Sequence, residues 1–249
     1  MLPFTAWAAE ELAPISPDRA GASVSADTVG AGLTQLELGW QYSRESVAAS
    51  PADRHFSIQA GVRFGLTRDF EVGMSGEPVV SLTGADSATN VGVLQLSAKY
   101  VFYESAPSSI LPTLGVQPFV KLPVAQPPID SGKTDGGLLF LVSFDLPYAF
   151  SLDLNAGMAG ISQGSHGPLA QAQAAAGVGC DLSLAFNLFS DLFFISREER
   201  HGRSSLTFDA GVLWRLSSNV AVDASVVTSL VGQGPDWGVS AGVSVRWGR

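Results

Sequence analysis

An apolar residue at every second position is the feature that most constrains this chain, and the pattern recurs from residue 36 to residue 247. Near the C-terminus the apolar set alternates with Gly, Ser and Arg residues. That set is Trp237, Val239, Ala241, Val243, Val245 and Trp247. Successive side chains of a β-strand point to opposite faces, so each stretch has one apolar and one polar face. Repeated strands of this kind are typical of a transmembrane β-barrel.

The composition narrows the class of protein. The 249 residues include 14 Lys and Arg against 23 Asp and Glu, a net charge of −9. Without a basic stripe, nucleic acid is not an expected partner. A soluble β-sandwich, the alternative fold, usually carries more charge than the 15% found here. No run reaches the roughly 18 apolar residues of a transmembrane helix. The single Cys180 excludes an internal disulfide or a CxxC metal site, so we expect no metal or cofactor.

The alternation predicts an all-β fold, a single antiparallel transmembrane barrel of about 12 strands. The expected strands span 32–43, 55–65, 69–77, 90–102, 112–122, 137–146, 150–159, 169–182, 186–196, 204–216, 220–228 and 236–247. Tight turns such as 217–219 alternate with longer polar loops such as 77–89, although the turn at 103–111 is longer than this scheme expects. Short turns at one rim and long loops at the other are expected to be periplasmic and extracellular respectively.

The N-terminal region, residues 1–31, precedes the barrel of residues 32–249. Ala6, Trp7 and Ala8 match a small-x-small cleavage site, but the charged and apolar regions of a full signal peptide are missing. We interpret the start as a signal-peptide remnant, because a barrel of this kind must be exported. Residues 10–31 are expected to form a periplasmic lead-in that can tuck into the lumen.

Charged side chains on the expected strands share the polar parity. Facing lipid, each would cost roughly 2–4 kcal/mol at mid-bilayer, so this parity directs them into the lumen. The lumen-facing candidates are Glu37, Arg63, Glu71, Lys99, Lys121, Asp209, Arg215 and Arg246. The members from Glu37 to Lys121 lie on consecutive strands and are expected to form a mixed-charge strip along one wall. Such a strip could orient a solute, or it could close the lumen with ion pairs.

Aromatic residues gather toward the ends of the expected strands, where amphipathic rings suit the headgroup region of a membrane. The interface candidates are Trp40, Tyr42, Phe64, Tyr100, Trp214, Trp237 and Trp247. Trp247 is expected to be the final outward aromatic, read by the barrel-assembly machinery. Membrane lipid and lipopolysaccharide are the other expected partners.

One pair of residues suggests chemistry. His55 and Ser57 are two apart on an expected strand and therefore share a face. Some outer-membrane lipid hydrolases place a His and a Ser in this way, because a serine nucleophile needs an adjacent base. No third orienting group or oxyanion donor is identifiable, so we expect no catalytic residues and no enzymatic activity.

Several short motifs together resemble a known family. They are Asp18-Arg19, the run from Gln35 to Gly39, the run from Phe64 to Val72, Lys99-Tyr100, and Lys121-Leu122-Pro123. These resemble the phenol meta-pathway family (MetA-pathway of phenol degradation) of outer-membrane transporter-like β-barrels. The resemblance implies a link to the breakdown of aromatic compounds, and it carries no catalytic residues.

The expected protein is therefore a porin-like barrel of the outer membrane of a Gram-negative bacterium. Its expected role is a passive channel, transporter or binding barrel for small organic compounds, with aromatic compounds among the candidates. A sealed structural or interaction barrel without transport is the alternative, and a lipid hydrolase is the third class.

Overall fold

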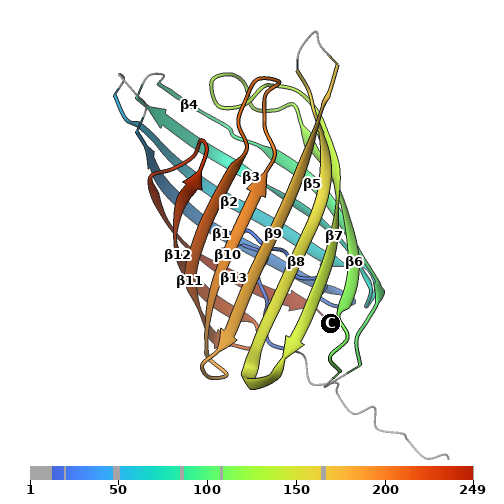
Figure 1. Ribbon diagram of the computed structural model, residues 1–249. Helices are drawn as coiled ribbons and strands as arrows, with labels where there is room; N and C mark the ends of the chain where they lie inside the picture. The colour runs from blue at the N-terminus through green and yellow to red at the C-terminus, as the bar shows by residue number, and fades with distance from the viewer. Residues whose placement is uncertain are drawn as a thin grey trace, which may run out of the picture.

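Twelve long antiparallel strands form one closed barrel in the computed structural model (Figure 1). The structure describes residues 13–19, 21–46, 51–84, 87–106, 109–163 and 167–248. The long strands are β1 (Leu33–Glu45), β2 (Asp53–Gly65), β3 (Phe70–Thr83), β5 (Leu94–Tyr103), β6 (Thr113–Leu122), β7 (Asp135–Leu146), β8 (Phe150–Ile161), β9 (Leu169–Asp181), β10 (Phe186–Ile195), β11 (Ser205–Ser217), β12 (Val220–Val231) and β13 (Trp237–Gly248). Each pairs with its neighbours, and β1 pairs with β13 from Leu33↔Gly248 to Arg44↔Trp237, which closes the sheet.

The predicted fold class and the strand pattern are confirmed. The Ala-rich run in β9 lies within the expected strand 169–182 and pairs with β8 and β10. Long loops lie at one end of the barrel, drawn uppermost in Figure 1. Short connections lie at the other end, including the 3-10 turn Pro147–Ala149 and the two residues between β11 and β12. The connection between β5 and β6 is the longer one at this end.

Two neighbouring predicted boundaries are wrong. The expected strand 69–77 stops before Pro78, whereas β3 continues to Thr83. A short strand, β4 (Ala88–Asn90), folds back onto this extension, so the next long strand begins at Leu94 rather than at residue 90. Proline has no N–H for the ladder and is confined to bulges and edges. Here the β2–β3 register shifts between Ile58 and Ala60, opposite Pro78. This bulge lets β3 continue past the proline.

The outer face of the barrel is apolar. Outward side chains such as Leu38, Met74, Leu96, Leu188 and Val243 are exposed, although they are large and hydrophobic. A soluble protein rarely exposes so continuous an apolar surface, whereas lipid is its natural solvent. Within the described ranges, no helix combines the length and the hydropathy that spanning a membrane requires.

The two faces of β13 provide a test of this arrangement. Val243 is 37% exposed on the outer face. Val243→Arg should lower the free energy of unfolding by about 2–4 kcal/mol, the cost of an arginine facing lipid at mid-bilayer depth. The measurement is urea unfolding of the protein refolded in lipid vesicles. Val243→Leu is the matched control and should change the free energy by less than about 1.5 kcal/mol. Equal losses in the two variants would show that Val243 does not face lipid.

Candidate functional site

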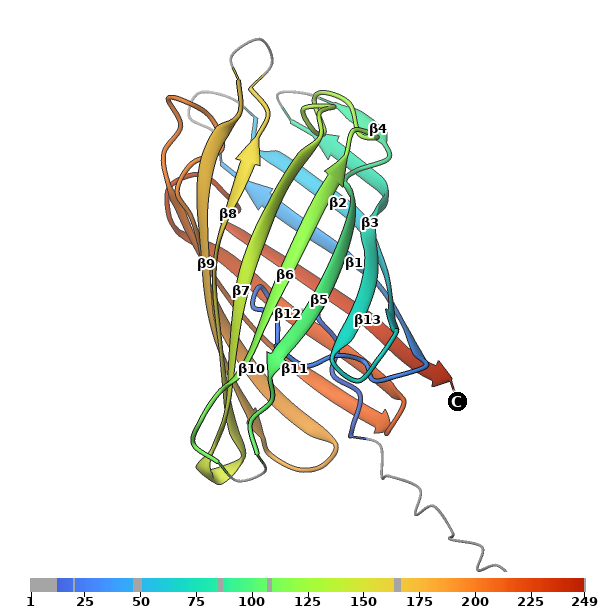
Figure 2. The same cartoon turned by 90° about the vertical axis from the view of Figure 1, so that its right-hand side faces the viewer.

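The N-terminal lead-in, here residues 13–19 and 21–30, lies inside the barrel (blue in Figure 2). Ile15 is fully buried and packs with Leu213 and Ala221 of the wall. Its N–H donates to the carbonyl of Ser218 at 3.0 Å. The lead-in thus enters at the short-turn end and is anchored there by apolar contact as well as by backbone hydrogen bonding.

Side chains of the barrel wall bind the backbone of the lead-in. Glu37 accepts hydrogen bonds from the N–H groups of Asp18 and Arg19 at 3.3 and 2.9 Å. Across the lumen, Asn155 both accepts from the N–H and donates to the carbonyl of Val24, each at 2.8 Å. A peptide without a strand partner needs such substitutes, because buried N–H and C=O groups must be hydrogen-bonded. Wall side chains therefore take the place of a neighbouring strand.

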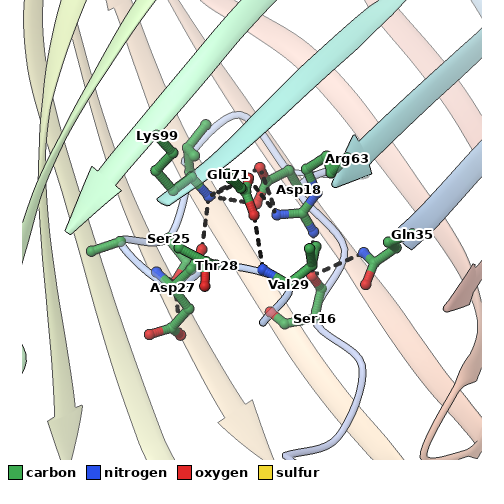
Figure 3. Close-up of polar contacts among 12 residues, drawn as sticks. Ser16, Asp18, Ser25, Asp27, Thr28, Val29, Gln35, Arg63, Glu71 and Lys99 are labelled. Carbon is green, nitrogen blue, oxygen red and sulfur yellow. Dashed lines mark hydrogen bonds and ion pairs between the residues drawn. The ribbon is translucent and has the colours of Figure 1, made fainter. Parts of the chain in front are cut away.

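An ionic cluster joins the wall to the lead-in (Figure 3). We call it the lead-in cluster, and its members are Asp18, Glu37, Arg63, Glu71 and Lys99. Arg63 Nη1 lies 3.0 Å from Asp18 and 3.3 Å from Glu71, and Arg63 Nη2 lies 3.1 Å from Glu37. Lys99 Nζ lies 3.2 Å from Asp18 and 3.6 Å from Glu71. Lys99 also donates to the carbonyl of Asp27 at 2.9 Å.

Burial makes this cluster energetically important. The Lys99 side chain is only 1% exposed. Charges removed from water are tolerated when they are paired, and loss of one partner leaves an uncompensated buried charge. The cluster therefore holds the lead-in firmly inside the barrel.

The remaining lumen-facing candidates lie elsewhere, so the expected continuous strip is divided. Lys121 forms its ion pairs with Asp130 and Asp135 near the long-loop end rather than with the lead-in cluster. Near the short-turn end, Arg215 pairs with Asp181 at 2.8 Å. Arg246 donates to the carbonyl groups of Ala13 and Ser218 at 2.6 and 3.0 Å.

Asp209 lies directly opposite Asp191 in the β10–β11 ladder. Asp191 accepts hydrogen bonds from Ser23 of the lead-in through both its N–H and its hydroxyl. Asp209 Oδ1 is buried and has no hydrogen-bond partner within the described part of the chain. The wall of β10 and β11 is therefore acidic where it meets the lead-in.

Six of the seven aromatic candidates lie toward strand ends. Tyr42 and Trp237 meet near the long-loop end, with ring centroids 5.6 Å apart. Near the short-turn end are Phe64, Tyr100, Trp214 and Trp247. Trp40 faces outward from the middle of β1. Placement of these rings at the membrane interfaces stays a prediction.

Asp18 and Arg19 are the site residues that strand periodicity misses. They lie in the lead-in, outside any strand, so no alternation assigns them a face. The one signal was the Asp18-Arg19 motif of the family resemblance. In the structure the two neighbours bind opposite kinds of wall residue: Asp18 joins the cations Arg63 and Lys99, and Arg19 joins the anion Asp223.

Two cavities lie in the lumen on either side of the lead-in. One, of about 500 Å³, lies toward the long loops and is lined by Gln41, Gln59 and Gln95. The other, of about 670 Å³, lies toward the short turns and is lined by Asp145, Ser151 and Asp181. Asp18, Arg19 and Gly21 line both. The lead-in thus separates the two cavities, and we call its part around Asp18, Arg19 and Gly21 the septum.

The pair His55 and Ser57 shows no catalytic geometry. Ser57 is fully buried, and its hydroxyl has no hydrogen-bond partner among the described residues. A serine nucleophile is activated by a hydrogen bond to a base, so this arrangement lacks the first requirement of that chemistry.

A closed barrel with an apolar exterior and a charged interior defines a bacterial outer-membrane β-barrel. The family model described as "Putative MetA-pathway of phenol degradation" matches residues 17–247. The chain belongs to this family, in agreement with the resemblance seen in its motifs. No curated protein matches the chain in sequence.

Solved outer-membrane barrels share the fold. The COG4313 outer membrane channel from Pseudomonas putida F1 is similar with a TM-score of 0.68 and 13% identity, covering 94% of this chain and 100% of that one. The NanC porin gives 0.56 at 11% identity, covering 85% and 98%. The KdgM porin in complex with disordered oligogalacturonate gives 0.56 at 6% identity, covering 84% and 98%. At these identities the likeness shows the fold.

The lead-in cluster predicts a stability effect. Arg63→Ala removes a cation shared by Asp18, Glu37 and Glu71 and should lower the free energy of unfolding by about 3–5 kcal/mol. The measurement is urea unfolding in vesicles. Arg68→Ala is the control, because Arg68 pairs with Glu104 at the exposed rim and such a pair contributes up to about 1 kcal/mol. Similar losses in the two variants would contradict a special role for the cluster.

Proposed function

We propose that this protein is a passive outer-membrane channel for small organic compounds, with the lead-in as its internal plug. The observation that carries this proposal is the pair of cavities that meet at the lead-in, where Asp18, Arg19 and Gly21 line both. The wall contributes many small residues to these cavities, so the lumen retains space on both sides of the septum. The proposal assigns no catalytic activity to the chain.

The cavity toward the long loops favours solutes that donate hydrogen bonds. Gln117 Oε1 and Asp209 Oδ1 both belong to side chains that line it, and both atoms are buried without a hydrogen-bond partner among the residues that the structure describes. An unsatisfied buried acceptor costs free energy until a donor reaches it. A small hydroxylated or amine-bearing organic molecule, aromatic members included, supplies such donors.

The division of the chain belongs to the same proposal. Residues 1–31 are assigned as signal-peptide remnant and periplasmic lead-in, and residues 32–249 as the barrel. The start of β1 at Leu33 and the position of the described lead-in within the lumen support this division. Outer-membrane lipid, lipopolysaccharide and the barrel-assembly machinery are the proposed partners.

A sealed barrel without transport is the second candidate, and the lead-in cluster favours it. Its buried ion pairs would lock the septum in place. In that case the cavities are packing defects rather than parts of a path.

Conductance of the refolded full chain in planar bilayers separates the two candidates. We expect defined current steps from the wild type, and larger or more frequent steps from Arg63→Ala/Lys99→Ala, which loosens the septum. Arg68→Ala, at the rim, should conduct like the wild type. Silence of all three proteins, together with phenolic tracer uptake no higher in expressing cells than in cells with an empty vector, would remove the transport proposal.

A further inference from the structure

The guanidinium of Arg19 occupies a slot in the wall at the seam of the barrel, where β1 pairs with β13. Nη2 and Nε approach the two carboxylate oxygens of Asp223 at 3.1 and 3.4 Å. Nη1 donates to the side-chain oxygen of Gln59 at 3.1 Å. Gly39 and Gly242, directly paired across β1 and β13, form the floor. These four residues, Gly39, Gln59, Asp223 and Gly242, are called the Arg19 slot.

The slot fits a planar cation closely. A Cβ atom on Gly39 would lie 1.8 Å from Arg19 Nη1, and one on Gly242 would lie 2.6 Å from Arg19 Cζ. Neither glycine has a positive φ, so backbone conformation does not require glycine at either position. The absence of a side chain is what admits the guanidinium. Asp223, at the end of the slot, has a fully buried side chain.

Arg19 also lies in the part of the lead-in that lines both cavities. The described residues on either side of position 20, Asp18–Arg19 and Gly21–Ser23, lie where the two cavities meet, and they are bound to different walls. Arg19 binds Gln59 of β2 and Asp223 of β12 beside the seam, whereas Ser23 binds Asp191 of β10. Withdrawal of the guanidinium would remove the contacts with Gln59 and Asp223, whereas the ion pairs of Asp18 and the hydrogen bonds of Ser23 would stay in place.

We propose that Arg19 is the latch of a gate: the septum closes the lumen while the guanidinium occupies the Arg19 slot, and the two cavities join when it leaves. This inference rests on the proposed channel function and adds its regulation. Arginine suits the role better than lysine. A planar fork binds a carboxylate through two nitrogens and lies flat on a glycine floor, which a lysine ammonium cannot do.

Two variants remove the latch by different means. Arg19→Ala deletes the guanidinium, whereas Gly39→Ala keeps it and fills the slot. Each should raise the open fraction of single-channel recordings by about ten- to a hundredfold, the change expected when a charge-assisted hydrogen-bonded contact is lost from the closed state. Gly61→Ala is the matched control, because its Cβ would have its nearest contact at an ordinary 3.7 Å. It should behave like the wild type.

Chemical rescue tests the slot directly. Methylguanidinium at millimolar concentration should return Arg19→Ala toward the closed state, and methylammonium should not. Arg19→Ala/Asp223→Asn should show no rescue. A second readout does not depend on current: methylguanidinium should raise the thermal unfolding midpoint of refolded Arg19→Ala, but not that of the double variant.

The outcomes separate the latch from the channel. If the wild type conducts and Arg19→Ala conducts no more, the latch is overturned and the channel stands. Equal responses of Arg19→Ala and the double variant to methylguanidinium also overturn it. If every variant is silent, the channel fails and the gate with it, while the unfolding midpoint still reports whether the slot binds a guanidinium.

Discussion

Every backbone N–H and C=O in the hydrocarbon layer needs a partner, and the rest of this structure depends on that constraint. An open sheet would leave two unpaired edges in lipid, so the sheet must close. Here closure is made by β1 and β13, whose ladder runs from Leu33↔Gly248 to Arg44↔Trp237. Once the sheet is closed, the alternation of side chains divides lipid from lumen, and strand charges within the hydrocarbon layer must lie inside.

A lumen of this size cannot hydrate those charges fully, so they are neutralised by protein groups. The wall itself supplies two cations and two anions in Arg63, Lys99, Glu37 and Glu71. The lead-in adds a carboxylate next to the cations and a guanidinium next to Asp223. Because adjacent lead-in residues carry opposite charges to different parts of the wall, the segment is pinned where it divides the lumen.

Periodicity predicts the strands because the lipid-facing side of each strand must be apolar. It identifies β13 from the alternation that ends at Trp247, and it resolves the Ala-rich β9 as a strand. It fails at Pro78, because a bulge lets the ladder pass a residue with no N–H. It places Lys121 inside but cannot show that Asp130, from a loop, becomes its partner. It says nothing of Arg19, since an irregular segment has no alternating faces.

The wall recognises the lead-in mainly through its peptide groups. Glu37, Glu71 and Asn155 accept from backbone N–H groups, and Arg63 and Lys99 donate to backbone carbonyls. Peptide groups are the same whatever side chain follows. The lead-in should therefore tolerate substitution at most positions during evolution, except at Asp18 and Arg19. The strand residues that bind its backbone should not tolerate single substitutions. In this protein the residues that identify the plug therefore lie mainly on the strands that bind it.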